Sequence, residues 1–156
     1  MKRGDYMVHV FVEQAKQLKV DAGDTVDPLI EIGCMGTKKF STSKEKIDNT
    51  QVINWNEHIF MEFNNKEPNE LEKAKVSLKM LDKGIFKDEM IGYYEFDLSY
   101  IYLQPDHALM HKWIVMSNPE GEDFSEVTAY FKMSITVSGV GDPNIAIEDD
   151  PNPEKE

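Results

Sequence analysis

Cysteine is almost absent from this sequence of 156 residues, which contains only Cys34. No disulfide can form within the chain, and a lone thiol fits a reducing compartment. Long apolar runs are also absent: no stretch of about 18 apolar residues occurs, so no membrane-spanning helix is expected. Residues 1–7 lack an apolar stretch after their basic pair, which predicts no secretory signal. These absences together predict a soluble cytoplasmic domain.

Basic residues are in a clear minority. The chain has 17 Lys and Arg against 29 Asp and Glu, a formal net charge of −12. Nucleic-acid binding needs a basic surface that neutralises phosphates, so no nucleic-acid partner is expected. The acidic excess is strongest in residues 142–156, which also contain three prolines and little apolar content. This composition predicts a disordered acidic tail or linker that follows a domain of residues 1–141.

Helical patterns are scarce and strand patterns dominate. Val8, Val10 and Val12 occupy alternate positions, as in a half-buried strand. Short helical turns are expected only at residues 67–74 and 99–103. Strands are expected at eight segments, residues 6–13, 29–32, 38–42, 56–63, 75–81, 91–98, 112–116 and 127–137. Many short strands separated by turn signals predict an all-β fold, an eight-stranded antiparallel β-sandwich.

Two acidic loops follow two of these strands. The first contains Asp21 and Asp27 around Gly23, and the second runs from Asp82 to Glu89. Ca²⁺ takes six to eight oxygen ligands in a flexible cage, which carboxylates on two neighbouring loops can supply. Either loop alone is also explained as a solvated turn, because Asp and Gly favour turns for local backbone reasons. The pair predicts one site built from both loops.

No pattern of catalytic residues is found. The sequence has no G-x-S-x-G motif and no glycine-rich phosphate loop, so no enzymatic activity is expected. His107 and His111 are four residues apart, but Pro105 and a predicted loop argue against a helical metal site. A structural role is the simpler interpretation of both histidines.

Three stretches resemble a C2 domain. They are residues 15–32 with Asp21 and Asp27-Pro28, residues 38–63 with Trp55-Asn56-Glu57, and residues 75–92 with Asp82 and Asp88-Glu89. Residues 103–119 and 129–142 are similar to a C2 module from the amino-terminal part of the ferlin family.

The ferlin resemblance implies a C2 fold of type II topology, in which the opening strand leads directly into the first calcium loop. It also implies a non-catalytic module that targets or tethers a membrane-anchored parent protein to membranes in vesicle trafficking or fusion. The module would be cytoplasmic and peripheral to the membrane. The alternative is a degenerate C2 domain that acts in protein–protein interaction.

The resemblance also implies a calcium site, with one departure. Asp21 and Asp27 match the two first-loop aspartates, and Asp82, Asp88 and Glu89 match the acidic positions of the third loop. Met80 stands where the family has an aspartate that bridges two ions. A thioether is a poor ligand for a hard cation. Calcium binding is therefore expected to be weak or absent.

Lipid contacts are expected at two places. Lys38, Lys39, Lys44 and Lys46 resemble the basic strand patch that meets anionic phospholipid. Strict alternation separates Lys39 from the other three, and lysines on an edge strand also protect it from edge-to-edge pairing. Ile85 and Phe86 are apolar residues of the third loop that can insert into a bilayer. An anionic phospholipid surface is the expected partner, with protein partners left open.

Overall fold

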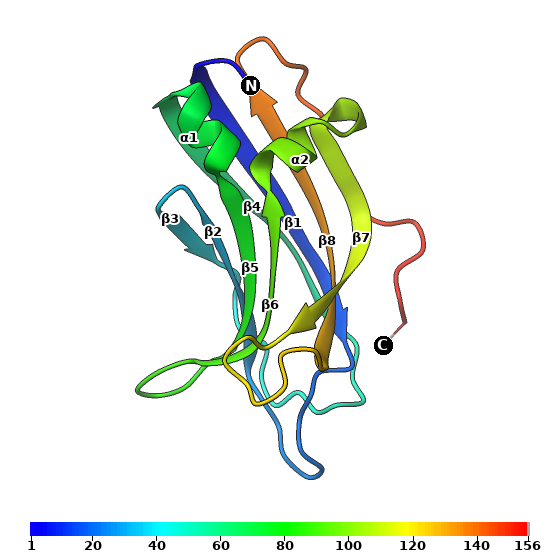
Figure 1. Ribbon diagram of the computed structural model, residues 1–156. Coiled ribbons are helices and arrows are strands. Elements are labelled where there is room, and N and C mark those ends of the chain that lie inside the picture. The colour runs from blue at the N-terminus through cyan, green and yellow to red at the C-terminus, as the bar shows by residue number, and fades with distance from the viewer. Residues whose placement is uncertain (156) are drawn as a thin grey trace.

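Eight antiparallel strands form two facing sheets in the computed structural model, which describes residues 1–155 (Figure 1). One sheet has the order β4-β1-β8-β7 and the other β3-β2-β5-β6. A single residue pair, Tyr93 with Ser117, connects β6 to β7, so the hydrogen-bonded ladder folds over into two layers there. The predicted all-β, eight-stranded antiparallel sandwich is confirmed.

Each predicted segment coincides with an observed element. The strands are β1 (Gly4–Lys16), β2 (Pro28–Cys34), β3 (Thr37–Phe40), β4 (Ile53–Lys66), β5 (Lys75–Asp82), β6 (Glu89–Asp97), β7 (Ala108–Ser117) and β8 (Val127–Gly139). The helices are α1 (Pro68–Lys73), α2 (Leu98–Tyr102) and a 3-10 turn (Pro105–His107). No helix among residues 1–155 is both long and apolar enough to cross a membrane.

The opening strand lies in the middle of its sheet. β1 pairs with β4 on one side and β8 on the other, so that Val10 faces both Ile59 and Ile135. From its last residue, Lys16, the chain enters directly the loop that contains Asp21 and Asp27. This is the arrangement expected of the type II topology.

The core lies between the two sheets and is built by alternation along the strands. Val8, Val10 and Val12 are fully buried, and the ring of Trp55 packs edge-on against Phe131 at 6.3 Å. Apolar side chains at every second position of a strand lie on one face, so both sheets present an apolar face to the same interior.

Four connections lie together at one end of the sandwich (Figure 1). They are residues 17–27, 41–52, 83–88 and 118–126, and we call them the loop end. Helices α1 and α2 lie at the opposite end. The two acidic loops therefore lie at the same end, as the sequence predicts.

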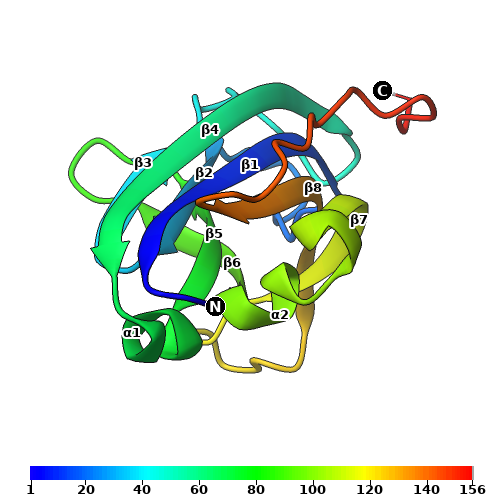
Figure 2. The ribbon, with the colours of Figure 1, turned by 90° about the horizontal axis from the view of Figure 1, so that it is seen from above.

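The acidic tail contains no helix or strand in its described part, residues 142–155. Seen from above, it runs over the outer face of the sheet that contains β1 and β8 (Figure 2). Ile147 is buried and Glu154 is hydrogen-bonded to Gln14. Residue 156 lies outside the described residues, and the division into a domain of residues 1–141 and a linker remains a prediction.

Candidate functional site

Asp27 ties three loops of the loop end together. Its N–H donates to Oδ1 of Asp82 at 2.8 Å, and its own Oδ1 accepts the N–H of Lys46 at 2.8 Å. Its carbonyl oxygen accepts the N–H of Lys83 at 3.0 Å. Asp27 and Asp82, predicted to share a site, are therefore in direct contact. Each has one carboxylate oxygen engaged by the backbone.

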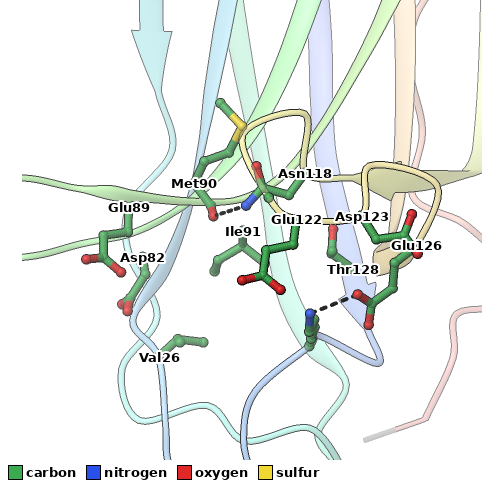
Figure 3. Close-up of a pocket in the computed structure, with 12 residues that line it drawn as sticks. Val26, Asp82, Glu89, Met90, Ile91, Asn118, Glu122, Asp123, Glu126 and Thr128 are labelled. Carbon is green, nitrogen blue, oxygen red and sulfur yellow. Dashed lines mark hydrogen bonds and ion pairs between the residues drawn. The ribbon is translucent and has the colours of Figure 1, made fainter.

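An acidic cleft of about 370 Å³ opens beside this contact (Figure 3). Asp82 and Glu89 line one side, from the ends of β5 and β6. Glu122, Asp123 and Glu126 line the other side, from the loop between β7 and β8. Sequence reasoning missed these three, although the acidic run Glu120-Gly-Glu-Asp-Phe-Ser-Glu126 was the available signal.

Lys19 contributes a cation to this cleft. Its Nζ lies 2.9 Å from Oε2 of Glu126. The hydrogen bond and the charge of Glu126 raise the pKa of Lys19 above its ordinary value, and Asp21 and Glu122 add smaller contributions. A resident ammonium group offsets part of the negative potential that would attract a metal ion.

The remaining predicted calcium ligands differ in position. Asp21 lines a second hollow together with Asp82 and Glu89. Asp88 is exposed and its Oδ1 accepts the N–H of Gly84 at 3.1 Å, inside its own loop. Within residues 1–155, the predicted acids form no group of three whose ligand atoms lie within 4.8 Å of one another. They surround the loop end without forming a closed cage.

Met80 lies in the core, two residues before Asp82 at the end of β5. Its side chain is fully buried, and it pairs with Ile30 of β2 and Gly92 of β6. It shares the inward parity of Val76 and Leu78 on β5. A thioether can be buried there without an unmet hydrogen bond, whereas a carboxylate could not.

The four predicted lipid-binding lysines are divided among different surfaces. Lys39 pairs with the inward-facing Ile32, and its Nζ donates to the carbonyl oxygen of Phe60 on β4 at 2.6 Å. It thereby connects the edges of the two sheets. Lys38 lies at the alternate parity with Phe40, while Lys44 and Lys46 belong to the loop of residues 41–52.

Apolar side chains project from the loop end. Ile85 and Phe86 are 95% and 99% exposed. Phe124, in the loop that borders the acidic cleft, is 70% exposed and was not singled out from the sequence. Apolar side chains from two loops of the loop end, which also carry acids of the cleft, therefore face solvent.

A second polar cluster lies on the outer face of the sheet β4-β1-β8-β7. Glu13 accepts a hydrogen bond from Ser134 Oγ at 2.6 Å and lies 2.7 Å from His111 Nδ1. Asp150 of the tail completes a group whose ligand atoms lie within 4.8 Å of one another. Ser134 is fully buried, and its Oγ donates to the carboxylate of Glu13 and lies 3.3 Å from His111 Nδ1, the same nitrogen that contacts Glu13. The histidine therefore does not stand between serine and carboxylate as in a nucleophilic triad.

Comparison with known proteins gives these sites a family context. A family model described as "C2 domain" matches residues 6–115. Myoferlin of Xenopus tropicalis is 28% identical over 142 residues, which are 90% of this chain and 7% of that protein. Myoferlin of Homo sapiens is 27% identical over 142 residues, which are 90% of this chain and 6% of that protein. The chain thus spans less than a tenth of the length of these curated relatives.

Solved structures agree on the fold. A structure of two C2 domains of extended synaptotagmin 2 superposes with a TM-score of 0.68 at 13% identity, covering 91% of this chain and 42% of that one. A calcium-bound structure of the same two domains gives a TM-score of 0.65 at 13% identity, covering 91% and 45%.

Proposed function

The chain belongs to the C2 domain family, and we propose that it is a non-catalytic module that brings its parent protein to anionic phospholipid membranes. Its similarity to ferlins supports a role in vesicle trafficking or fusion, in the cytoplasm and at the surface of a membrane to which the parent is anchored. The dependence on calcium is weak.

The observation that supports this proposal best is the exposure of Ile85 and Phe86 at the loop end. Fully exposing a large apolar side chain to water forgoes about 1.5–3 kcal/mol of burial free energy. Insertion into the interfacial region of a bilayer recovers that free energy. Phe124, which lies in a neighbouring loop, gives the module a second point of insertion.

The donor chemistry of the second hollow, which Asp21, Asp82 and Glu89 line, fits calcium, because carboxylate oxygens are the ligands that a hard cation prefers. Asp21, Asp82 and Glu89 would hold the ion, with Asp27 positioning Asp82. A bound ion would supply positive charge next to the apolar tips, where an anionic headgroup arrives. The incomplete cage, Lys19 and the buried Met80 support the weak affinity class, on the order of 10⁻⁴ to 10⁻³ M.

Co-sedimentation with vesicles that contain phosphatidylserine tests the proposal. We expect the wild-type chain to bind, and binding to increase modestly at about 1 mM Ca²⁺. The double variant Ile85→Ser/Phe86→Ser should lose binding by about tenfold or more, since two apolar anchors are removed.

Leu103→Ser is the matched control, because Leu103 is 81% exposed and follows α2, at the end away from the loops. It should leave vesicle binding unchanged. If the wild-type chain fails to bind the vesicles both with and without Ca²⁺, the membrane proposal is wrong and the second candidate function is favoured.

That second candidate is a protein-interaction module. It is favoured by the mixed charge on the outer face of the sheet β3-β2-β5-β6, where Lys79 lies 3.6 Å from Glu31 and Lys75 pairs with Asp97. Such a face lacks the one-signed basic surface that anionic lipid selects.

A further inference from the structure

The tail of the chain lies against a specific set of side chains on β1, β7 and β8. Gln14, Lys132 and Trp113 are direct neighbours in register, since Gln14 pairs with Lys132 and Lys132 with Trp113. Lys16 follows Gln14 on the same strand, and its Nζ lies 4.6 Å from the ring centroid of Trp113. We call these four residues the tail-binding face.

Gln14 binds the backbone of the tail. The side-chain amide nitrogen of Gln14 donates to the carbonyl oxygen of Glu154 at 2.9 Å, and its Oε1 accepts the N–H of Glu154 at 3.0 Å. One side-chain amide thus bonds both polar backbone groups of a single residue. Gln14 is 2% exposed with the tail in place, and its side-chain nitrogen also donates to Oδ1 of Asn54 at 2.6 Å.

The two lysines contact the carboxylates of the tail. Lys132, which is 3% exposed, forms an ion pair with Asp150, and Lys16 Nζ lies 2.8 Å from Oε1 of Glu154. Both ammonium groups also lie over the ring of Trp113, Lys132 at 5.6 Å from its centroid. With the tail in place the ammonium group of Lys132 is nearly buried and Asp150 is its anionic partner there, since an unpaired buried charge is strongly unfavourable.

Two β-bulges shape the floor next to this face. The register shifts between Val12 and Gln14 on β1 and between Leu109 and Lys112 on β7. These bulges bring Glu13 and His111 to Ser134 of the intervening strand. Bulges are features that redirect a side chain, and here they redirect two toward the position of Asp150.

The chemistry selects a peptide over a metal ion or a lipid surface. Lys132 forms an ion pair with Asp150, which belongs to the group of Glu13, His111 and Asp150, and its charge opposes a cation there. A flat bilayer does not supply a backbone N–H and C=O pair for Gln14. An extended acidic peptide supplies every group that the face contacts.

We propose that the tail-binding face is a binding site for an extended acidic peptide segment of a partner protein, which residues 147–154 of this chain occupy in cis. The ligand presents an apolar residue, an acid three positions later and a second acid four positions after that, as Ile147, Asp150 and Glu154 do. This site is separate from the loop end, so the module can contact a membrane and a protein together.

Fluorescence anisotropy with a labelled peptide of residues 144–155 tests the proposal. The full chain carrying Asp150→Asn and Glu154→Gln has a weakened tail and should bind the probe at least about tenfold more tightly than the wild-type chain. The wild-type tail competes at the high effective concentration of a tethered ligand. Adding Lys16→Gln or Lys132→Gln to the weakened variant should reduce probe binding by about tenfold.

Lys38→Gln is the matched control, since Lys38 lies on the other sheet, and it should leave probe binding unchanged. Lys16→Gln keeps the test valid if Lys132→Gln perturbs folding, which circular dichroism and thermal unfolding reveal. The proposal is overturned if the folded, weakened variant binds the probe no better than the wild type. It is equally overturned if Lys38→Gln reduces binding as much as Lys16→Gln, or if the variant gains affinity for phosphatidylserine vesicles instead of the probe.

Discussion

Met80 is a single side chain that connects the core with the candidate calcium site. It belongs to β5, two residues before Asp82, and has the same strand parity. Met80 contributes to the core and Asp82 lines the acidic cleft, so the core and the cleft meet at the end of β5. Across from Met80, Gly92 leaves no room for a larger residue, since a Cβ there would meet Met116 Cβ at 2.7 Å.

Met80→Asp should restore an oxygen ligand at the expense of stability. Without calcium we expect a loss of about 3 kcal/mol, because an ionised carboxylate would enter a fully buried position. At about 1 mM Ca²⁺ the melting temperature of the variant should rise by more than the melting temperature of the wild type, because a ligand that binds the folded state stabilises it. Scanning calorimetry of both proteins with and without Ca²⁺ measures this difference.

Asp27→Asn is the companion variant, because it keeps the shape of Asp27 and removes its charge. It should abolish the small calcium response of the wild type. Micromolar calcium binding by the wild type would contradict our interpretation of Met80, and so would an absent calcium response in Met80→Asp.

At the element scale, β1 and β4 are joined by a polar contact on the outer face of their sheet. His9 Nε2 and His58 Nδ1 lie 2.8 Å apart, and the rings of His9 and Phe60 stack at 4.1 Å. Burial first, and the charge of His58 second, lower the pKa of His9 to about 4. In the folded chain His9 is therefore neutral where β1 pairs with β4.

This contact predicts a loss of stability on mild acidification. The unfolded chain binds a proton at His9 near its ordinary pKa of about 6.5, whereas the folded chain does so near 4. Between these values the unfolded state holds more protons, so stability falls as the pH falls through this window. The urea midpoint at about pH 7.5 and about pH 5 should differ more for the wild type than for His9→Gln. If the urea midpoint shifts equally in the wild type and in His9→Gln, then His9 is not the cause of the acid sensitivity.

At the scale of the whole molecule, the two sheets share one core, and the tail is attached from outside. The core cluster includes Trp55 and residues of both sheets, whereas Ile147 is buried but does not belong to that cluster. Trp55 lies inside the sandwich and Trp113 beneath the two lysines that bind the tail. The fluorescence of Trp55 therefore reports on the core of the sandwich, and the fluorescence of Trp113 reports on the attachment of the tail.

Unfolding of the sandwich should be one cooperative transition, because a shared core cannot be lost in parts. In Trp55→Phe the fluorescence comes from Trp113, and we expect it to change at a lower urea concentration than the far-ultraviolet circular dichroism, as the tail leaves first. Adding Asp150→Asn and Glu154→Gln should remove that early step. Coincident transitions in Trp55→Phe itself would show that the tail unfolds together with the sandwich.

Sequence patterns were sufficient to predict the eight strands and both short helices. Alternation of apolar residues is a local property, and it sets which face of each strand is buried before any strand has a partner. The acidic loops and the exposed apolar pair Ile85 and Phe86 were visible for the same reason, as departures from that alternation between strands.

Which of these residues come into contact depends on how the strands are arranged in space. Lys39 reaches the carbonyl of Phe60, 21 positions away, and Glu13 meets His111 across 98 positions through two bulges that alternation does not reveal. Glu122 lines the acidic cleft because the loop between β7 and β8 lies beside β6. The tail, judged by composition, lacked the apolar content for a core, yet its carboxylates pair with lysines of β1 and β8. Such contacts depend on strand order and register, which no local pattern specifies.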